Sequence, residues 1–182
     1  SGSMHISSAQ TFDPSVGASL ETGGAVTQSV GAAISASKLA IKAKGNVSLD
    51  TANNSVGALA GSIAGAGTEY FHFKDIDALS IEAGDGVTGI GITGFSSYTA
   101  GSPNGVIELQ AGGNISQTAG LSGAAVWATT SSGAVDLTAI SNATGVIAGS
   151  ATTGFAYKSS NTIALKDVNG HSGLSTSASG NI

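Results

Sequence analysis

The chain has 182 residues, of which only 9% are charged, with no arginine, no cysteine and a formal net charge of −5. Six scattered lysines leave no basic stripe to neutralise phosphates, which argues against nucleic acid or a phospholipid surface as a partner. The absence of cysteine excludes disulfides and thiolate metal sites. Disordered chains are usually rich in charge and proline, whereas this one has two prolines, 28 glycines and a positive mean hydropathy.

The two ends of the chain suggest a segment taken from a longer protein. Residues 1–4 (SGSM) are typical of a cloning scar, which leaves residues 5–182 as the native part. Residues 179–182 (SGNI) have the pattern that begins another repeat unit. The longest uncharged stretch near the middle, residues 51–68, is mostly Ala, Gly and Ser, so no membrane insertion is expected.

An internal duplication is the strongest signal in the sequence, and it divides the chain into two copies of about residues 23–111 and 112–182. The matched segments are 23–29 (GGAVTQS) with 112–118 (GGNISQT), 45–49 (GNVSL) with 133–137 (GAVDL), 57–62 (GALAGS) with 145–150 (GVIAGS), and 71–74 (FHFK) with 155–158 (FAYK). The pairs share glycines and alternating aliphatic residues, with few catalytic types of side chain. Such a pattern is typical of a repeat scaffold.

A shorter period runs inside each copy, because an apolar-x-apolar stretch followed by glycine returns about every 20 residues. That length is too short for a helical repeat and fits one turn of a β-solenoid. The sequence therefore predicts an all-β fold, a right-handed parallel β-helix with coils of about 20 residues, eight or nine coils in all.

Period-two alternation predicts which side chains face the interior. In residues 38–44 (KLAIKAK) the lysines fall on one side and the aliphatic residues on the other, so a strand is favoured over the alternative of a helix across residues 32–44. Positive φ is expected at two sharp corners, Asp85-Gly86 and Asn169-Gly170. The pairs predicted to point inward are Val47/Leu49, Phe71/Phe73, Leu79/Ile81, Ile107/Leu109, Val135/Leu137, Phe155/Tyr157 and Ile163/Leu165.

Residues 94–105 (GFSSYTAGSPNG) are present in the first copy alone. They form either a loop or one extra coil, and the sequence leaves both alternatives open. A loop on a rigid scaffold is a common place for recognition. If residues 94–105 protrude, they are the expected contact surface.

Motifs that would carry chemistry are weak. Residues 84–89 (GDGVTG) fit the dinucleotide pattern G-x-G-x-x-G, but no helical pattern follows them. Asp75 and Asp77 could share an ion, although solvated surface positions are favoured. His5, His72 and His171 are far apart in the sequence, so no catalytic residue, metal ligand, cofactor-binding residue or cofactor is assigned, and no enzymatic activity is expected.

Three aromatic residues are the candidates for contact with a partner, since a sugar ring can stack on an exposed π face. Phe95 and Tyr98 lie in the segment that the second copy lacks. Trp127 aligns with Leu39 in the duplication, which favours a core or half-buried position over a binding role.

Residues 39–49 (LAIKAKGNVSL), 73–84 (FKDIDALSIEAG) and 107–117 (IELQAGGNISQ) resemble the degenerate repeats of filamentous haemagglutinin-like exoproteins. This resemblance covers most of residues 17–182. It implies a central shaft segment of an adhesin that the two-partner route secretes to the surface of a Gram-negative bacterium. The implied partners are a host-cell or matrix glycan or protein, neighbouring coils of the same exoprotein, and an outer-membrane transporter during secretion. A glycan-binding or glycan-cleaving β-helix is the alternative.

Overall fold

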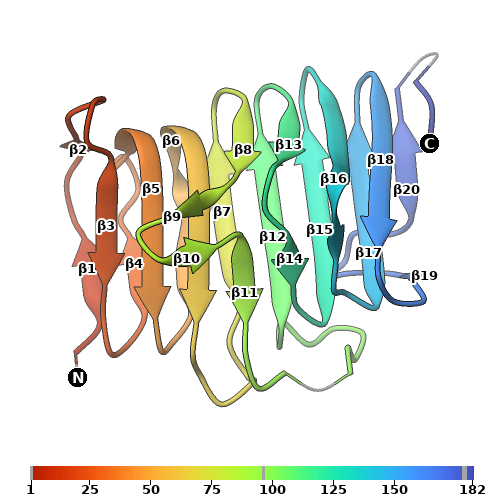
Figure 1. Ribbon diagram of the computed structural model, residues 1–182, viewed down its shortest axis with the longest axis horizontal. Coiled ribbons are helices and arrows are strands. Elements are labelled where there is room, and N and C mark those ends of the chain that lie inside the picture. Colours follow the sequence, from red (N-terminus) through yellow and green to blue (C-terminus); the bar gives the residue numbers. More distant parts are fainter. Residues whose placement is uncertain (1, 96, 178–179) are drawn as a thin grey trace.

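The computed structural model describes residues 2–95, 97–177 and 180–182, and it folds as a right-handed parallel β-solenoid of about 8 turns with roughly 21 residues per turn. The strands stack side by side along the long axis of the molecule, from the N-terminal end to the C-terminal end (Figure 1). The described residues contain no helix, and β5 covers most of residues 32–44, where the sequence left a helix as the alternative.

Two faces contain all the parallel strands. The A face consists of β1 (Met4–Ile6), β4 (Val26–Gln28), the start of β6 (Val47–Ile63), β7 (Phe71–Asp75), β12 (Val106–Ala111), β15 (Ala125–Thr130), β17 (Val146–Ala151), β19 (Ala164–Leu165) and β20 (Leu174–Thr176). The B face, which bends partway along each coil, consists of β2 (Gln10–Thr11), β3 (Ala18–Glu21), β5 (Ile34–Ala43), the rest of β6, β8 (Leu79–Ile81), β11 (Ile90–Ile92), β13 (Ile115–Gln117), β14 (Leu121–Ser122), β16 (Ala134–Asn142) and β18 (Gly154–Ser159). The remaining strands, β9 (Ala83–Gly84) and β10 (Val87–Thr88), form an antiparallel hairpin.

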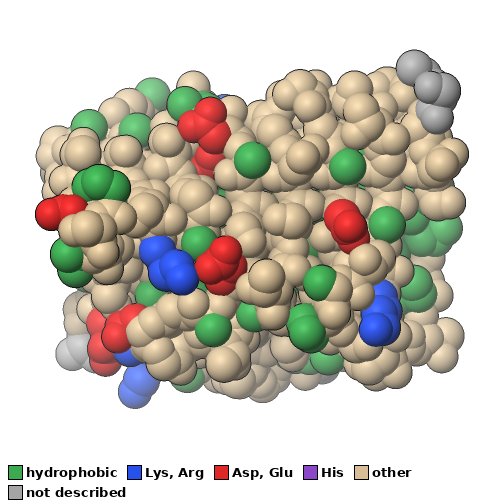
Figure 2. Space-filling model, turned by 45° about the horizontal axis from the view of Figure 1, so that its top comes forward, with side chains coloured by type: hydrophobic (Ala, Val, Ile, Leu, Met, Phe, Trp, Pro, Cys, Tyr) green, Lys and Arg blue, Asp and Glu red, His purple; other side chains and the backbone are tan. Residues whose placement is uncertain are grey.

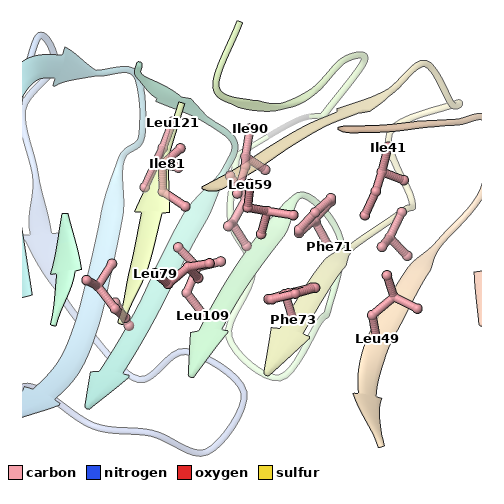
Figure 3. Close-up of a cluster of buried hydrophobic side chains, with 14 of the residues drawn as sticks. Ile41, Leu49, Leu59, Phe71, Phe73, Leu79, Ile81, Ile90, Leu109 and Leu121 are labelled. Atoms are coloured by element: carbon pink, nitrogen blue, oxygen red, sulfur yellow. The ribbon is translucent and has the colours of Figure 1, made fainter. Parts of the chain in front are cut away.

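The core is a column of aliphatic and aromatic side chains inside the coils. On the A face, Val47, Phe71 and Ile107 are successive partners in register, and none of them is exposed. Figure 3 shows such side chains from successive coils converging in the same interior. Burying this apolar surface is the main favourable contribution to folding, at roughly 25 cal/mol per Å².

The predicted alternation is correct for most pairs and wrong for the last one. Phe155 is buried and Tyr157 partly buried, as predicted, but Ile163 is 40% exposed and Leu165 is 60% exposed. Leu165 pairs with the buried Ile147. It remains exposed because no further coil in the described part of the chain covers it.

Matched residues of the two copies make matched contacts. The Asn54 side chain donates to the carbonyls of Leu49 and Lys74, and that of Asn142 donates to those of Leu137 and Lys158. Gly61 leaves room for the Phe71 ring, and Gly149 leaves room for the Phe155 ring.

The copies nevertheless use different faces of the solenoid. Val47 belongs to the A face, whereas its counterpart Val135 belongs to the B face. The duplicated unit is therefore not a whole number of coils.

The insertion in the first copy is a loop in its described part. Residues 93–95 and 97–105 form no strand, and they connect β11 to β12 while both strands pair with the next coil. Residue 96, inside the predicted 94–105 segment, lies outside the described residues. Both predicted corners have the expected conformation, with φ of 47° at Asp85 and 50° at Asn169. Met4, which the sequence placed in a cloning scar, begins β1 and pairs with Val26.

Candidate functional site

The outer side of the A face carries a row of ionisable side chains that close charge contacts join across several strands. His72 of β7 pairs with Ser48 of β6 on one side and with Glu108 of β12 on the other. Glu108 in turn pairs with Trp127 of β15. Because parallel strands in register place matching side chains next to each other, these outward positions form a line across the coils. A second group lies on the outer side of the B face, where Lys42 of β5 contacts Asp85 of the hairpin at 2.9 Å and Lys38 contacts Glu82 at 3.1 Å.

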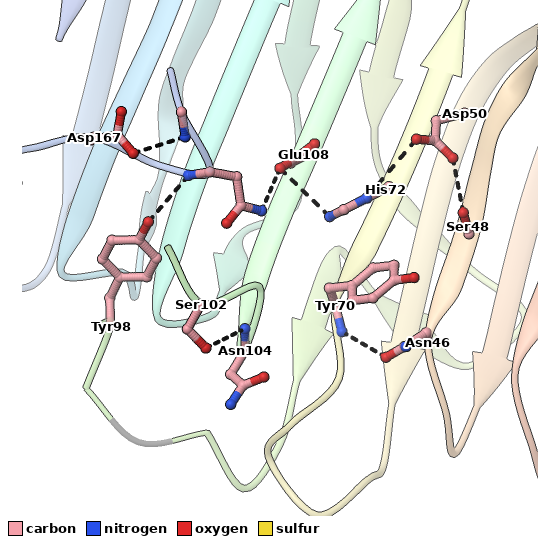
Figure 4. Close-up of polar contacts among 12 residues, drawn as sticks. Asn46, Ser48, Asp50, Tyr70, His72, Tyr98, Ser102, Asn104, Glu108 and Asp167 are labelled. Carbon is pink, nitrogen blue, oxygen red and sulfur yellow. Dashed lines mark hydrogen bonds and ion pairs between the residues drawn. The ribbon is translucent and has the colours of Figure 1, made fainter. Parts of the chain in front are cut away.

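We call Ser48, Asp50, His72 and Glu108 the polar row (Figure 4). The Ser48 hydroxyl donates to Asp50 Oδ1 at 2.9 Å, and Asp50 Oδ2 lies 4.0 Å from His72 Nδ1. His72 Nε2 lies 3.6 Å from Glu108 Oε1, too far for a hydrogen bond, and it has no hydrogen-bond partner. The imidazole therefore lies between two carboxylates with one buried nitrogen unsatisfied.

Burial decides the charge state of His72. It lowers the pKa of the imidazole, and this effect outweighs the opposite influence of the Glu108 and Asp50 carboxylates. His72 is thus neutral at neutral pH, and the polar row is a patch of negative charge. Tyr70 stacks on His72 with ring centroids 4.2 Å apart, so an aromatic ring lies beside this patch.

The C-terminal half of the same face is covered by a segment that we call the strap, residues 166–173. The strap interrupts the last A-face strand: Leu165 pairs with Ile147 and Leu174 pairs with Gly149, so eight residues stand opposite the single residue Ala148. The extra residues fold outward and cross the outer side of β17 and β15. Val168 of the strap is completely buried there.

A tight turn shapes the strap. Val168 and His171 exchange two backbone hydrogen bonds of 2.9 and 3.0 Å, and the Gly170 N–H donates to Asp167 Oδ1 at 2.8 Å. Asn169 and Gly170 have positive φ, at 50° and 89°. Asparagine and glycine tolerate this conformation, which explains why the sequence signal for this corner was reliable.

The turn presents two side chains to the face beneath it. Asn169 Nδ2 donates to Glu108 Oε1 at 2.7 Å, and the His171 ring stacks on Trp127 with centroids 3.8 Å apart and planes 15° apart. The Asn169 backbone N–H donates to the Tyr98 hydroxyl at 3.2 Å. Glu108 is 8% exposed as a result, and so is Trp127.

The three predicted contact residues lie on or beside this covered face. Trp127 is buried, but it lies outside the core, in a separate cluster with Val106 and Val168. Tyr98 is half-buried and packs against that cluster. Phe95 and Tyr98 line a groove of about 510 Å³ together with Lys166 of the strap.

Sequence reasoning missed the residues that complete the site. The sequence assigns no role to His72 or His171, because the histidines are far apart along the chain, yet His72 belongs to the polar row and His171 covers Trp127. Glu108 was not singled out, although it occupies an outward position between Ile107 and Leu109. Asp75 was expected at a solvated surface and is instead 2% exposed, where its carboxylate accepts backbone hydrogen bonds from Val56 and Asp77.

Other motifs take structural roles. Residues 84–89, the dinucleotide-like pattern, lie mostly in the β9–β10 hairpin, which crosses the outer side of β5 and β6 (Figure 1). His5 lies at the N-terminal end, where its ring bonds to Thr27 and Ser29. The described residues contain no group of three or more His, Asp or Glu side chains placed to hold a metal ion.

No family model, no curated protein and no solved structure matches the chain. In the described residues, no helix has the length and apolar character needed to cross a membrane.

Proposed function

We propose that the chain is a structural and adhesive shaft segment of a secreted bacterial surface protein, and that it has no catalytic activity of its own. The observation that carries this proposal is the unbroken column of core side chains, which successive coils share along the A face from Val26 to Ile147. A stack of this kind transmits stiffness along one axis and leaves its sides available for contact.

The outer A face is the proposed contact surface. It brings together the polar row, two aromatic–histidine stacks and the groove beside Phe95. Figure 2 shows a face on which charged side chains are few and most of the surface is neutral. On the B face, lysines and acidic residues pair with one another, as Lys42 does with Asp85 at 2.9 Å. A host-cell or matrix glycan or protein is the proposed partner.

The proposed location is the surface of a Gram-negative bacterium, with passage through an outer-membrane transporter. The support for this part is the resemblance of residues 39–49, 73–84 and 107–117 to the repeats of filamentous haemagglutinin-like exoproteins. That resemblance implies a long parallel β-helix, and the chain is a parallel β-solenoid.

A glycan-cleaving activity is the second candidate, and one observation favours it. The carboxylates of Asp50 and Glu108 flank the neutral imidazole of His72 on the outer side of the A face. Paired carboxylates are the usual acid and base of glycoside hydrolysis.

One experiment separates the two candidates. The purified chain is applied to a glycan array and to immobilised matrix proteins, and it is also incubated with a panel of polysaccharides while reducing ends are measured. We expect retention on the array or on a matrix protein without any release of reducing ends. Release that disappears in Glu108→Gln would instead support the enzyme, and neither retention nor release would overturn the adhesive proposal.

A further inference from the structure

The strap occupies the outer A face in the way that a bound ligand would. It makes three kinds of contact there: an amide N–H on the Glu108 carboxylate, a flat ring on Trp127, and a backbone N–H on the Tyr98 hydroxyl. The strap covers these groups with a single tight turn, while the coils beneath continue their regular pairing. Under the strap, Glu108 and Trp127 are thus held on the strands β12 and β15, and Tyr98 reaches the same face from the loop before β12.

The contacts define the chemistry that this face accepts. The Glu108 carboxylate accepts from an uncharged amide, and the indole of Trp127 provides a broad apolar plane. A pyranose ring offers a C–H face that stacks on an indole, and a 2-acetamido group offers an amide N–H. An N-acetylated amino sugar thus offers in one molecule the amide N–H that Asn169 supplies and the flat stacking face that His171 supplies.

Charge excludes the anionic glycans. Asp50 and Glu108 are acidic and His72 is neutral, so no positive side chain of the polar row could balance a sulfate or a uronic acid. Close approach of a third negative charge to two partly buried carboxylates is unfavourable.

We propose that the face formed by Glu108 and Trp127 is a binding site for N-acetylated amino sugars, and that Asn169 and His171 of the strap occupy it in the absence of the sugar. This inference rests on the proposed adhesive function and names its ligand class. The strap competes with the sugar, so the apparent affinity of the wild-type chain is reduced by the fraction of molecules in which the strap is open.

The test compares the wild-type chain with the double variant N169A/H171A, which removes both competing side chains. Trp127 is the only tryptophan in the sequence, so its fluorescence reports directly on the site. The probes are N,N′,N″-triacetylchitotriose and, as the matched control that carries hydroxyls in place of acetamido groups, cellotriose. We expect the double variant to bind triacetylchitotriose about tenfold or more tightly than the wild type, since a minor open state is typically populated at 10% or less.

Further variants assign the contacts. In the N169A/H171A background, adding E108A should remove the preference for triacetylchitotriose over cellotriose, and adding W127A should abolish binding measured by calorimetry. His5→Ala removes a histidine remote from the strap and should bind as the wild type does. Circular dichroism checks the fold of each variant, and if the double variant is unfolded, N169A alone supplies the comparison.

A folded strap variant that binds triacetylchitotriose no better than the wild type would overturn the inference. Equal binding of the two trisaccharides would overturn the acetamido assignment. Neither result bears on adhesion of the wild-type chain to arrays or matrix proteins. The proposed function is therefore tested by a separate measurement.

Discussion

The two sides of β12 differ in almost every respect, although they belong to one strand. Ile107 and Leu109 point into the column and have no exposed surface. Glu108, between them, points out and binds the strap. The inner side repeats from coil to coil with aromatic and aliphatic partners, Phe71 and Phe73 on β7 and Val126 and Ala128 on β15, whereas the outer side changes at each strand.

This difference shows that the solenoid geometry constrains the inward-facing residues much more than the outward-facing ones. An inward residue must fit between the coils before and after it, because protein interiors are packed as densely as organic crystals. An outward residue meets no such restriction. Polar and aromatic side chains can therefore accumulate on the outer A face without disturbing the stack.

The largest effect is expected from a charge placed in the column. Leu137→Asp would bury a carboxylate among aliphatic side chains and disrupt the interfaces on both sides of its coil, at a cost of about 4 kcal/mol or more. Ala139→Asp, at an exposed position of the same strand, is the matched control and should change the free energy of unfolding by less than about 0.5 kcal/mol. Urea denaturation measures both, and equal stabilities would show that the inner and outer sides are wrongly assigned.

A single methyl group tests how tightly neighbouring coils approach. A Cβ at Gly149 would lie 2.2 Å from the Ala128 carbonyl oxygen and 2.4 Å from the Phe155 ring, so Gly149→Ala should cost about 2–3 kcal/mol. A Cβ at Gly145 would meet nothing closer than 3.9 Å. Gly145→Ala should therefore be nearly neutral in thermal melts, and a similar loss for both would mean that close packing is not the cause.

Acid should stabilise the interior through Asp75. Burial raises the pKa of this carboxyl from 3.8 to about 6, so the folded chain binds the proton more tightly than the unfolded chain. The free energy of unfolding should consequently rise as pH falls from 7 towards 4, by on the order of 2 kcal/mol from this group.

Asp75→Asn isolates that contribution, because the His72 imidazole acts in the opposite direction. Its lowered pKa makes the folded state less stable as pH falls below 6.5. The difference between the wild type and Asp75→Asn should grow in favour of the wild type on acidification. A difference that is constant with pH would contradict the raised pKa of Asp75.

The smallest effect is expected from removing the loop before β12. Deletion of residues 95–104 keeps every paired strand, and Phe95 Cβ lies 2.9 Å from an ideal Cβ at Gly105, so the flanking chain is already close. Loss of the Tyr98 packing should cost about 1 kcal/mol in denaturant titrations. Loss of cooperative unfolding would indicate that the segment contributes to the coil stack.

The sequence predicts the column well and the outer face poorly. Alternation identifies Phe71, Ile107 and Leu137 because burial imposes a period of two, and Asp85-Gly86 is identified because few residues adopt its conformation. Glu108 and His171 carry no such local signal. Glu108 meets Asn169 across 61 residues, and His171 meets Trp127, only because the strap departs from the last A-face strand.

Trp127 also shows that the sequence predicts the outer A face poorly. Its alignment with Leu39 favours the core, and it is indeed buried, but on the outer side of β15 and beneath His171. Trp127 is buried there because the strap covers it, and no residue near Trp127 in the sequence indicates that the strap will do so. An alignment between the two copies predicts that a residue is buried better than it predicts the side of the sheet on which that residue lies.

We propose that the interior builds the shaft and that the outer A face makes the contact with a partner. The most direct measurement is surface plasmon resonance on the glycan or matrix protein that retains the wild-type chain, with His72→Ala and His5→Ala as paired variants and thermal melts alongside. We expect His72→Ala to lose at least about tenfold in affinity while remaining folded, because His72 lies within the polar row, and His5→Ala to bind as the wild type does. Unchanged binding by a folded His72→Ala chain would contradict the assignment of the contact surface to the outer A face.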